Sequence, residues 1–247
     1  MTNGTRTTVD RFEGFADREG RFFRALARNQ RREWFAAHRR EYEEGWLEPM
    51  KGLLAEVRER LDRLFPHHPL GAPKVFRIHR DVRFSADKSP YKTNAACQFY
   101  HHDAGRGAGQ DAEGAGAGLY FQLADGDCFV AGGIWMPARP GLGKIRDALV
   151  EDPEGLDRIV RAPAFRRRFR ALDREAMLSR LPRGYAEGHP AEPWLRYKSF
   201  TATRMLTERE ATSARLPATL ERDFAVLVPL VRWLNGAIGY RAWERRY

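Results

Sequence analysis

The pattern of apolar and polar positions divides the chain into helical parts at both ends and an extended part between them. Near the amino terminus, large apolar residues recur every three to four positions, the spacing that buries one face of a helix. We therefore predict three helices there, the first of them capped by Asp17. Their ranges are 17–28, 31–44 and 49–64. Residues 1–9 have no such periodicity and are predicted to form a disordered tail.

The pattern then changes to alternation, in which every second side chain lies on the same face of a strand. It predicts a strand over 75–84 whose apolar face carries Phe76, Ile78, Val82 and Phe84 and whose polar face carries Arg77, His79, Asp81 and Arg83.

Further strands are predicted over 93–100, 118–124 and 127–136, the last two joined by a tight turn at Asp125 and Gly126. The Gly-rich segment 101–117 is predicted to be a flexible loop between strands.

Helical spacing returns after Pro137 and predicts helices over 141–151, 154–160, 163–175 and 216–235. Helices before and after one antiparallel meander of about four or more strands define an α+β fold. At 247 residues the chain can bury one sizeable core, so we predict a single domain over 10–247.

Composition narrows the class of protein. The longest nearly unbroken apolar run, 224–231, is too short to cross a bilayer, and the first residues lack the apolar stretch of a signal peptide. Cys97 and Cys128 are the only cysteines, which fits a reducing compartment. We therefore expect a cytoplasmic protein without a membrane partner.

The chain is basic, with a formal net charge of +10, which attracts phosphorylated ligands or nucleic acid. Of its 43 basic residues only six are lysines. If arginine has replaced interchangeable lysines, the lysines that remain are enriched where a compact ammonium group is needed. Lys74, Lys88 and Lys92 fall within nineteen residues, which directs attention to this segment.

Residues 76–92 combine a charged strand with a polar turn that would bring the lysines back toward the strand end. Converging arginines and lysines would bind phosphate or carboxylate, because guanidinium groups donate two parallel hydrogen bonds to these anions. In this hypothesis Tyr91 forms an aromatic wall. The predicted ligand-binding residues are Arg77, Arg80, Arg83, Ser85, Lys88, Tyr91, Lys92 and Lys198, and the candidates for orientation or acid–base chemistry are Asp81, Asp87 and Lys88.

A purely structural interpretation of the same residues is a lattice of internal ion pairs, in which Asp81 and Asp87 neutralise the arginines. The sequence identifies no cofactor. His67–His68 and His101–His102 lack the spacing of a closed metal site, so no metal is predicted. Motifs of the common nucleotide hydrolases, serine hydrolases and zinc proteases are also missing.

Several segments together resemble a known family. They are RREWFAAHRREYEEGWLEPM at 31–50, FRIHRDVRFSADKSPYKTN at 76–94, GGIWMP at 132–137, HP at 189–190 and YKSF at 197–200. They are similar to the signature blocks of the family catalogued as domain of unknown function 2461. The resemblance implies one domain over nearly the whole chain and carries over no catalytic residue.

The sequence thus predicts a protein that binds a small anionic, phosphorylated ligand at 77–92, and it leaves open whether the protein is an enzyme. One alternative is a nucleic-acid-associated module that uses the net charge and the arginines at 165–170. Another is a protein-interaction domain with an exposed apolar patch around Trp34, Phe35 and Trp46. The oligomeric state is not encoded in any pattern that we recognise.

Overall fold

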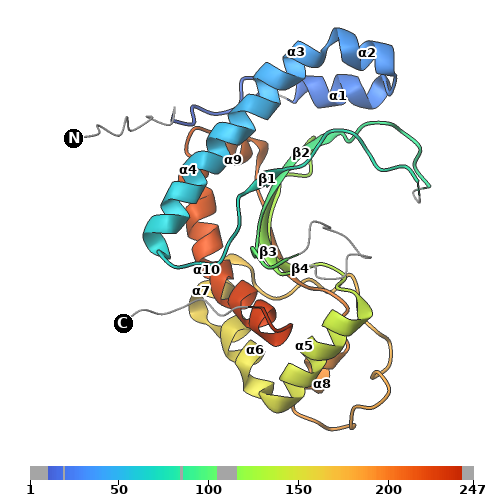
Figure 1. The fold of residues 1–247 in the computed structure, drawn as a ribbon, viewed down its shortest axis with the longest axis vertical. Helices are drawn as coiled ribbons and strands as arrows, with labels where there is room; N and C mark the ends of the chain where they lie inside the picture. Colours follow the sequence, from blue (N-terminus) through green and yellow to red (C-terminus); the bar gives the residue numbers. More distant parts are fainter. Residues whose placement is uncertain (1–10, 19, 84–85, 105–115, 241–247) are drawn as a thin grey trace.

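A five-stranded antiparallel sheet forms the centre of the computed structural model, which describes residues 11–18, 20–83, 86–104 and 116–240 (Figure 1). Each strand pairs with the one before it in the chain, so the sheet is a meander. This confirms the α+β class. The strands are β1 (Lys74–Val75), β2 (Asn94–Tyr100), β3 (Gly118–Ala124), β4 (Phe129–Ile134) and β5 (Phe200–Met205).

Strand β5 was not predicted. It pairs with β4 over its whole length, from Ile134 opposite Phe200 to Phe129 opposite Met205. In this strand Phe200 and Ala202 are fully buried, and the other side chains are polar or exposed. Two buried apolar side chains are too few to produce a recognisable alternation in the sequence.

The amino-terminal helices follow the predicted spacing with different boundaries. Although α1 begins four residues after Asp17, the Asp17 carboxylate still accepts hydrogen bonds from the backbone N–H groups of Arg21 and Phe22. The predicted helix over 31–44 breaks at His38, and its second half runs through a π-helical turn into the next helix. The elements are α1 (Arg21–Arg28), α2 (Arg32–Ala37), α3 (Arg39–Tyr42), η1 (Glu43–Leu47) and α4 (Glu48–Leu64).

The carboxyl-terminal helices confirm three of the four predicted segments closely, whereas the helix expected over 163–175 ends at Arg168. The chain leaves that helix through Arg170, which has a positive φ of 66°. The elements are α5 (Arg139–Glu151), α6 (Pro153–Arg161), α7 (Pro163–Arg168), α8 (Glu192–Leu195), α9 (Glu208–Ala211) and α10 (Leu216–Ala237).

The two faces of the sheet differ in what covers them. Helices α4 and α10 lie against one face, where Cys97, Phe121 and Val130 stand side by side across β2, β3 and β4 and are buried (Figure 1). The opposite face, which we call the open face, carries alternate residues of the same strands. Its side chains include Asn94, Gln98, Tyr120, Gln122 and Phe129, all partly exposed, and Met205, which is 55% exposed.

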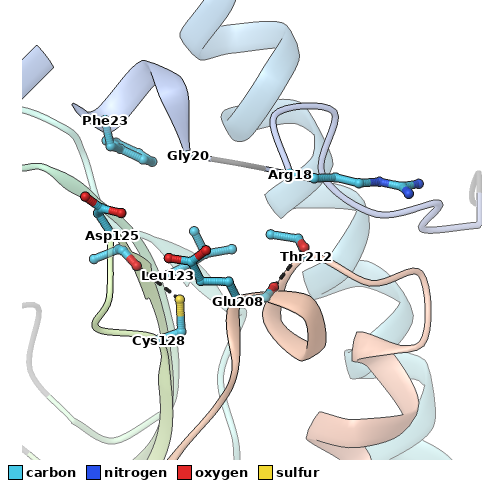
Figure 2. A pocket seen from close by; sticks show the side chains of 9 residues that line it. Arg18, Gly20, Phe23, Leu123, Asp125, Cys128, Glu208 and Thr212 are labelled. Carbon is cyan, nitrogen blue, oxygen red and sulfur yellow. Dashed lines mark hydrogen bonds between the residues drawn. The ribbon is translucent and has the colours of Figure 1, made fainter. Parts of the chain in front are cut away.

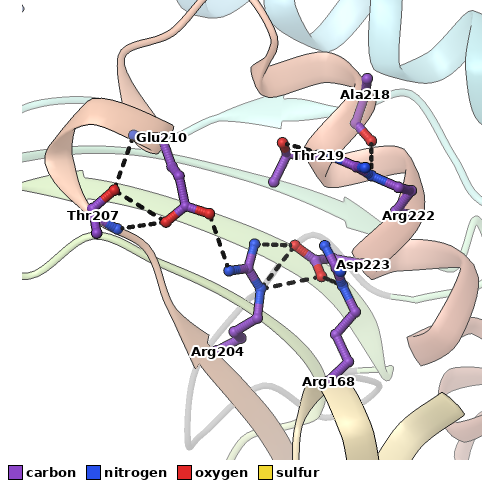
Figure 3. Close-up of polar contacts among 8 residues, drawn as sticks. All are labelled: Arg168, Arg204, Thr207, Glu210, Ala218, Thr219, Arg222 and Asp223. Carbon is purple, nitrogen blue, oxygen red and sulfur yellow. Dashed lines mark hydrogen bonds and ion pairs between the residues drawn. The ribbon is translucent and has the colours of Figure 1, made fainter.

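A buried ionic network joins the carboxyl-terminal elements on the helix-covered side (Figure 3). Asp223 of α10 is fully buried and accepts hydrogen bonds from the guanidinium groups of Arg168 and Arg204. Arg204 also lies 3.4 Å from Glu210, which forms a capping box with Thr207 at the start of α9. These contacts tie α7, β5, α9 and α10 together.

Within the described residues, no helix is both long enough and apolar enough to cross a membrane. The predicted tail over 1–9 and most of the Gly-rich loop lie outside the described part of the chain.

Candidate anion-binding site

The segment that the sequence singled out forms an irregular hairpin at the β1 edge of the sheet. The predicted strand over 75–84 is wrong in extent, because β1 ends at Val75 and pairing resumes only between His79 and Tyr91. The described residues between Asp81 and Ser89 form a loop at the hairpin tip. Phe84 and Ser85 lie outside the described residues.

The physical reason is a bulge in the strand that returns from the tip. Val75 and His79 are four residues apart, whereas their partners Cys97 and Tyr91 are six apart. Two extra residues must therefore bulge out of the returning strand, which bends the hairpin and changes the direction of its side chains. As a result Phe76 and Ile78 do not share one face, although the sequence predicted that they would. Phe76 contacts Tyr120 on the open face, whereas Ile78 is buried.

Two lysines meet where the bulge reaches the open face, and the charges of Arg77 and Arg80 lie near them. The Nζ atoms of Lys92 and Lys74 lie 5.2 Å and 5.9 Å from the centre of the Phe76 ring, the separation of a cation–π contact. Partial burial lowers the pKa of Lys92, and the nearby charges of Arg77, Arg80 and Lys74 lower it further. The three neighbouring cations thus make the potential at Lys92 positive.

Most of this charge is not neutralised by the protein. Among the described residues, no carboxylate lies within ion-pairing distance of Lys74, Arg77 or Lys92. Arg80 is the exception, since one of its terminal nitrogens lies 3.3 Å from Asp87. Its Nε–H group is buried and has no hydrogen-bond acceptor in the described part of the chain. An anion on the open face would supply the missing counter-charge.

The two candidate carboxylates are held in the ionised state. Hydrogen bonds from the Arg83 side chain and backbone lower the pKa of Asp81 to about 2. Hydrogen bonds from Ser89, together with the charge of Arg80, lower the pKa of Asp87. A carboxylate with a lowered pKa is a weak proton acceptor near neutral pH, so this arrangement favours orientation of arginines over proton transfer.

Ion pairs and hydrogen bonds hold the charged side chains at the tip, whereas the cations at the base of the hairpin mostly lack such partners among the described residues. At the tip, Arg83 pairs with Asp81 at 2.7 Å and Lys88 donates to the backbone oxygen of Val82 at 2.9 Å, all on exposed side chains. At the base, the charges of Arg77, Arg80 and Lys74 are near enough to Lys92 to lower its pKa.

Two other predicted residues lie apart from these cations. Tyr91 is only 4% exposed and stacks on Phe35 at a centroid distance of 4.5 Å, so the ring beneath the cations is that of Phe76 instead. Lys198 precedes β5 at the opposite edge of the sheet, and the register places it at the opposite end from Lys92.

Sequence reasoning missed the part of the site that other strands supply. Tyr120 lies 6.0 Å from Phe76 and 5.6 Å from Phe129 between ring centres, so three rings run from the cations across the open face. The Asn94 amide and the Tyr120 hydroxyl both donate to Gln122 Oε1, at 3.0 and 2.9 Å. Only the strand register brings these residues together. Among the residues that join the predicted ones at this site, Lys74 alone had a sequence signal, since it belongs to the lysine-rich segment.

A small pocket lies elsewhere, between the start of α1, the β3–β4 turn and α9 (Figure 2). Its volume of about 10 Å³ gives room for about one water molecule. The cavity is therefore too small for a metabolite, and the cations described above lie on an open surface. It is lined by Arg18, Gly20, Phe23, Leu123, Ala124, Asp125, Cys128, Glu208 and Thr212.

One group of side chains has metal-ligand chemistry, at the end of β2. The ligand atoms of His101, His102 and Asp103 lie within 4.8 Å of one another. Existing hydrogen bonds explain this proximity: His102 Nε2 lies 2.8 Å from Asp103, His102 Nδ1 bonds Pro69 O, and His101 Nδ1 accepts from the Asp103 N–H. We assign no metal to it.

Fold and site together define an α+β protein whose meander sheet is covered by helices on one face and carries a cationic, aromatic surface on the other. The chain belongs to the family described as conserved hypothetical protein DUF2461, whose model matches residues 20–233. Searches of curated proteins and of solved structures return no match. The family therefore supplies no reaction, and a function has to be argued from the site.

Proposed function

We propose that the protein binds a small anionic, phosphorylated ligand on the open face, at Lys74, Arg77, Arg80 and Lys92. The observation that carries the proposal is the half-buried Lys92, which is surrounded by three further cations and has no carboxylate partner among the described residues. Clustered positive charge without a counter-ion costs free energy in the empty protein. A bound phosphate removes that cost, because each cation then donates a charge-assisted hydrogen bond.

Arg80 and Arg77 suit a phosphate by the planar shape of the guanidinium group as well as by its charge. The contact with Asp87 holds Arg80 at the hairpin base. Planar guanidinium groups bind phosphate oxygens through paired N–H donors. Binding is the function that these residues support, since neither Asp81 nor Asp87 has the pKa of a general base.

Thermal unfolding with inorganic pyrophosphate tests the proposal. A ligand at a hundred times its Kd stabilises the protein by about 2.7 kcal/mol, which raises Tm by roughly 5–10 °C for a chain of this size. We expect this shift to disappear in Lys92→Met and Arg77→Met. Lys51→Met is the matched control, because Lys51 is an exposed lysine on α4 paired with Glu48, and its removal changes the net charge equally. An equal loss in all three variants would mean that general charge, and no site, attracts the anion.

Salt dependence separates this proposal from the nucleic-acid alternative. A polyanion bound by many surface cations loses affinity steeply as salt rises, whereas one phosphate in a defined cluster loses less. The segment 165–170, which suggested nucleic acid, is partly engaged in the fold. Arg168 pairs with the buried Asp223, and the rings of Phe165 and Phe169 are buried. Arg166, Arg167 and Arg170 remain exposed for such a role.

The protein-interaction alternative required an exposed apolar patch around Trp34, Phe35 and Trp46, and these rings do not form one. Trp46 is fully buried, Phe35 is 8% exposed, and Trp34 stacks on His38 at 4.0 Å. These rings belong to the core between the amino-terminal helices and the hairpin. As a further part of the proposal we place the protein in the cytoplasm, because Cys97 and Cys128 are free, buried thiols of the kind that a reducing compartment preserves.

A further inference from the structure

We infer that the ligand of the open face is a nucleotide, in which the phosphate contacts the cations and the base lies on the aromatic rings beside them. This inference rests on the proposed function and adds the class of ligand. It starts from the rings: Phe76, Tyr120 and Phe129 come from three neighbouring segments of the sheet, are partly exposed, and lie 6.0 and 5.6 Å apart in succession across it.

The rings favour a planar group over a simple phosphorylated sugar. Phe76 already has Lys74 and Lys92 near its ring, whereas Tyr120 and Phe129 lie one and two rings further from the cations. Stacking on an aromatic side chain stabilises any nucleobase, because every base has a π-face. A sugar phosphate would leave this partly exposed apolar surface unused.

Polar groups beside the rings suit the edge of a base. Gln122 is fixed, since its oxygen accepts from Asn94 and Tyr120 while its amide donates to Asp127 Oδ2 at 2.8 Å. This network leaves the Asn94 side-chain oxygen without a donor among the described residues. Asn94 follows Lys92 by two positions, so a ligand whose phosphate contacts Lys92 can present a base N–H group to Asn94.

Calorimetric titration of the full chain tests the stacking of a base on the rings separately from the binding of phosphate by the cations. The probes are adenosine 5′-monophosphate, uridine 5′-monophosphate, ribose 5-phosphate and adenosine. Each stacked base is expected to strengthen binding roughly 5- to 150-fold, so both nucleotides should bind that much more tightly than ribose 5-phosphate. Phe129→Leu should reduce nucleotide affinity toward that of ribose 5-phosphate and leave the sugar phosphate unchanged. Lys92→Met should weaken all three phosphorylated probes.

The control for the ring is Trp135→Leu, because Trp135 is 52% exposed and follows the opposite end of β4 from Phe129. Equal affinity for nucleotides and ribose 5-phosphate would overturn the inference and leave the proposed function standing. No binding of any phosphorylated probe would overturn both. Nucleotides that bind no more tightly than adenosine and are insensitive to Lys92→Met would support the ring surface and refute the phosphate site.

A 5′-phosphorylated oligonucleotide distinguishes the two sources of a nucleotide. If the natural ligand is a free nucleotide, affinity will not rise with strand length. Affinity that rises with length and falls steeply with salt would identify a single strand as the source. Both results support a nucleotide at this surface, whereas an oligonucleotide that binds Phe129→Leu and wild type equally would count against it.

Discussion

Removal of the Asp223 carboxylate by Asp223→Ala is the sharpest test of what holds the carboxyl-terminal half of the fold together. Asp223 is fully buried and accepts from both Arg168 and Arg204 (Figure 3). Removing one partner of a buried ion pair costs about 3–5 kcal/mol, because the remaining charge is left uncompensated. The arginine side chains are 30% and 21% exposed, so each can still reach water, and we expect the lower end, about 3 kcal/mol.

For a chain of this length, that loss corresponds to a Tm decrease of roughly 6–12 °C. Differential scanning calorimetry measures it, with Glu44→Ala as control, because water screens the exposed Arg40–Glu44 pair and its loss should change Tm little. Arg204→Ala should destabilise the wild type strongly and the Asp223→Ala variant weakly, since the two residues share one interaction. If Asp223→Ala lowers Tm no more than Glu44→Ala, the network does not stabilise the fold. Pyrophosphate binding should survive, because Arg204 lies on the helix-covered side of β5.

Three further results are expected. Lys92→Met should stabilise the empty protein at neutral pH, because it removes a charge that folding disfavours. The pKa of Lys92 in the folded protein lies below its ordinary 10.5, so the stability of the wild type rises with pH until the pH reaches about 10.5. Urea unfolding measured from neutral pH to about pH 10.5 should show a flatter rise in the variant. Gly133→Ala should lower the free energy of unfolding by at least about 2 kcal/mol, since a Cβ there would lie 1.9 Å from Phe200 O at a φ of +127°. Gly143→Ala in α5 should raise it by about 0.4–1 kcal/mol, because there is open space around Gly143. Chemical denaturation measures both changes. Cys97 and Cys128 should resist a thiol-specific dye until the protein unfolds, because burial raises the pKa of both thiols; labelling in the native state would contradict their placement.

The sequence determined the elements that local pattern controls. Helical periodicity predicted α4 and α10 because each presents one continuous apolar stripe, and alternation predicted β2, β3 and β4 because each has one buried face. The Asp125–Gly126 turn followed from the ease with which Gly126 adopts a positive φ of 68°. The concentration of lysines in one segment also indicated where the cations of the hairpin lie.

Only the tertiary structure decided how these elements form a surface. The bulge before β2 is set by pairing between residues far apart in the chain, so no local pattern showed that Lys92 would join Phe76 on the open face while Tyr91 turned into the core. Lys198 appeared to belong with the other lysines, yet four strand pairings place it at the far edge of the sheet. Tyr120, Asn94 and Phe129 carried no signal, because their role depends on neighbours that strand register alone provides.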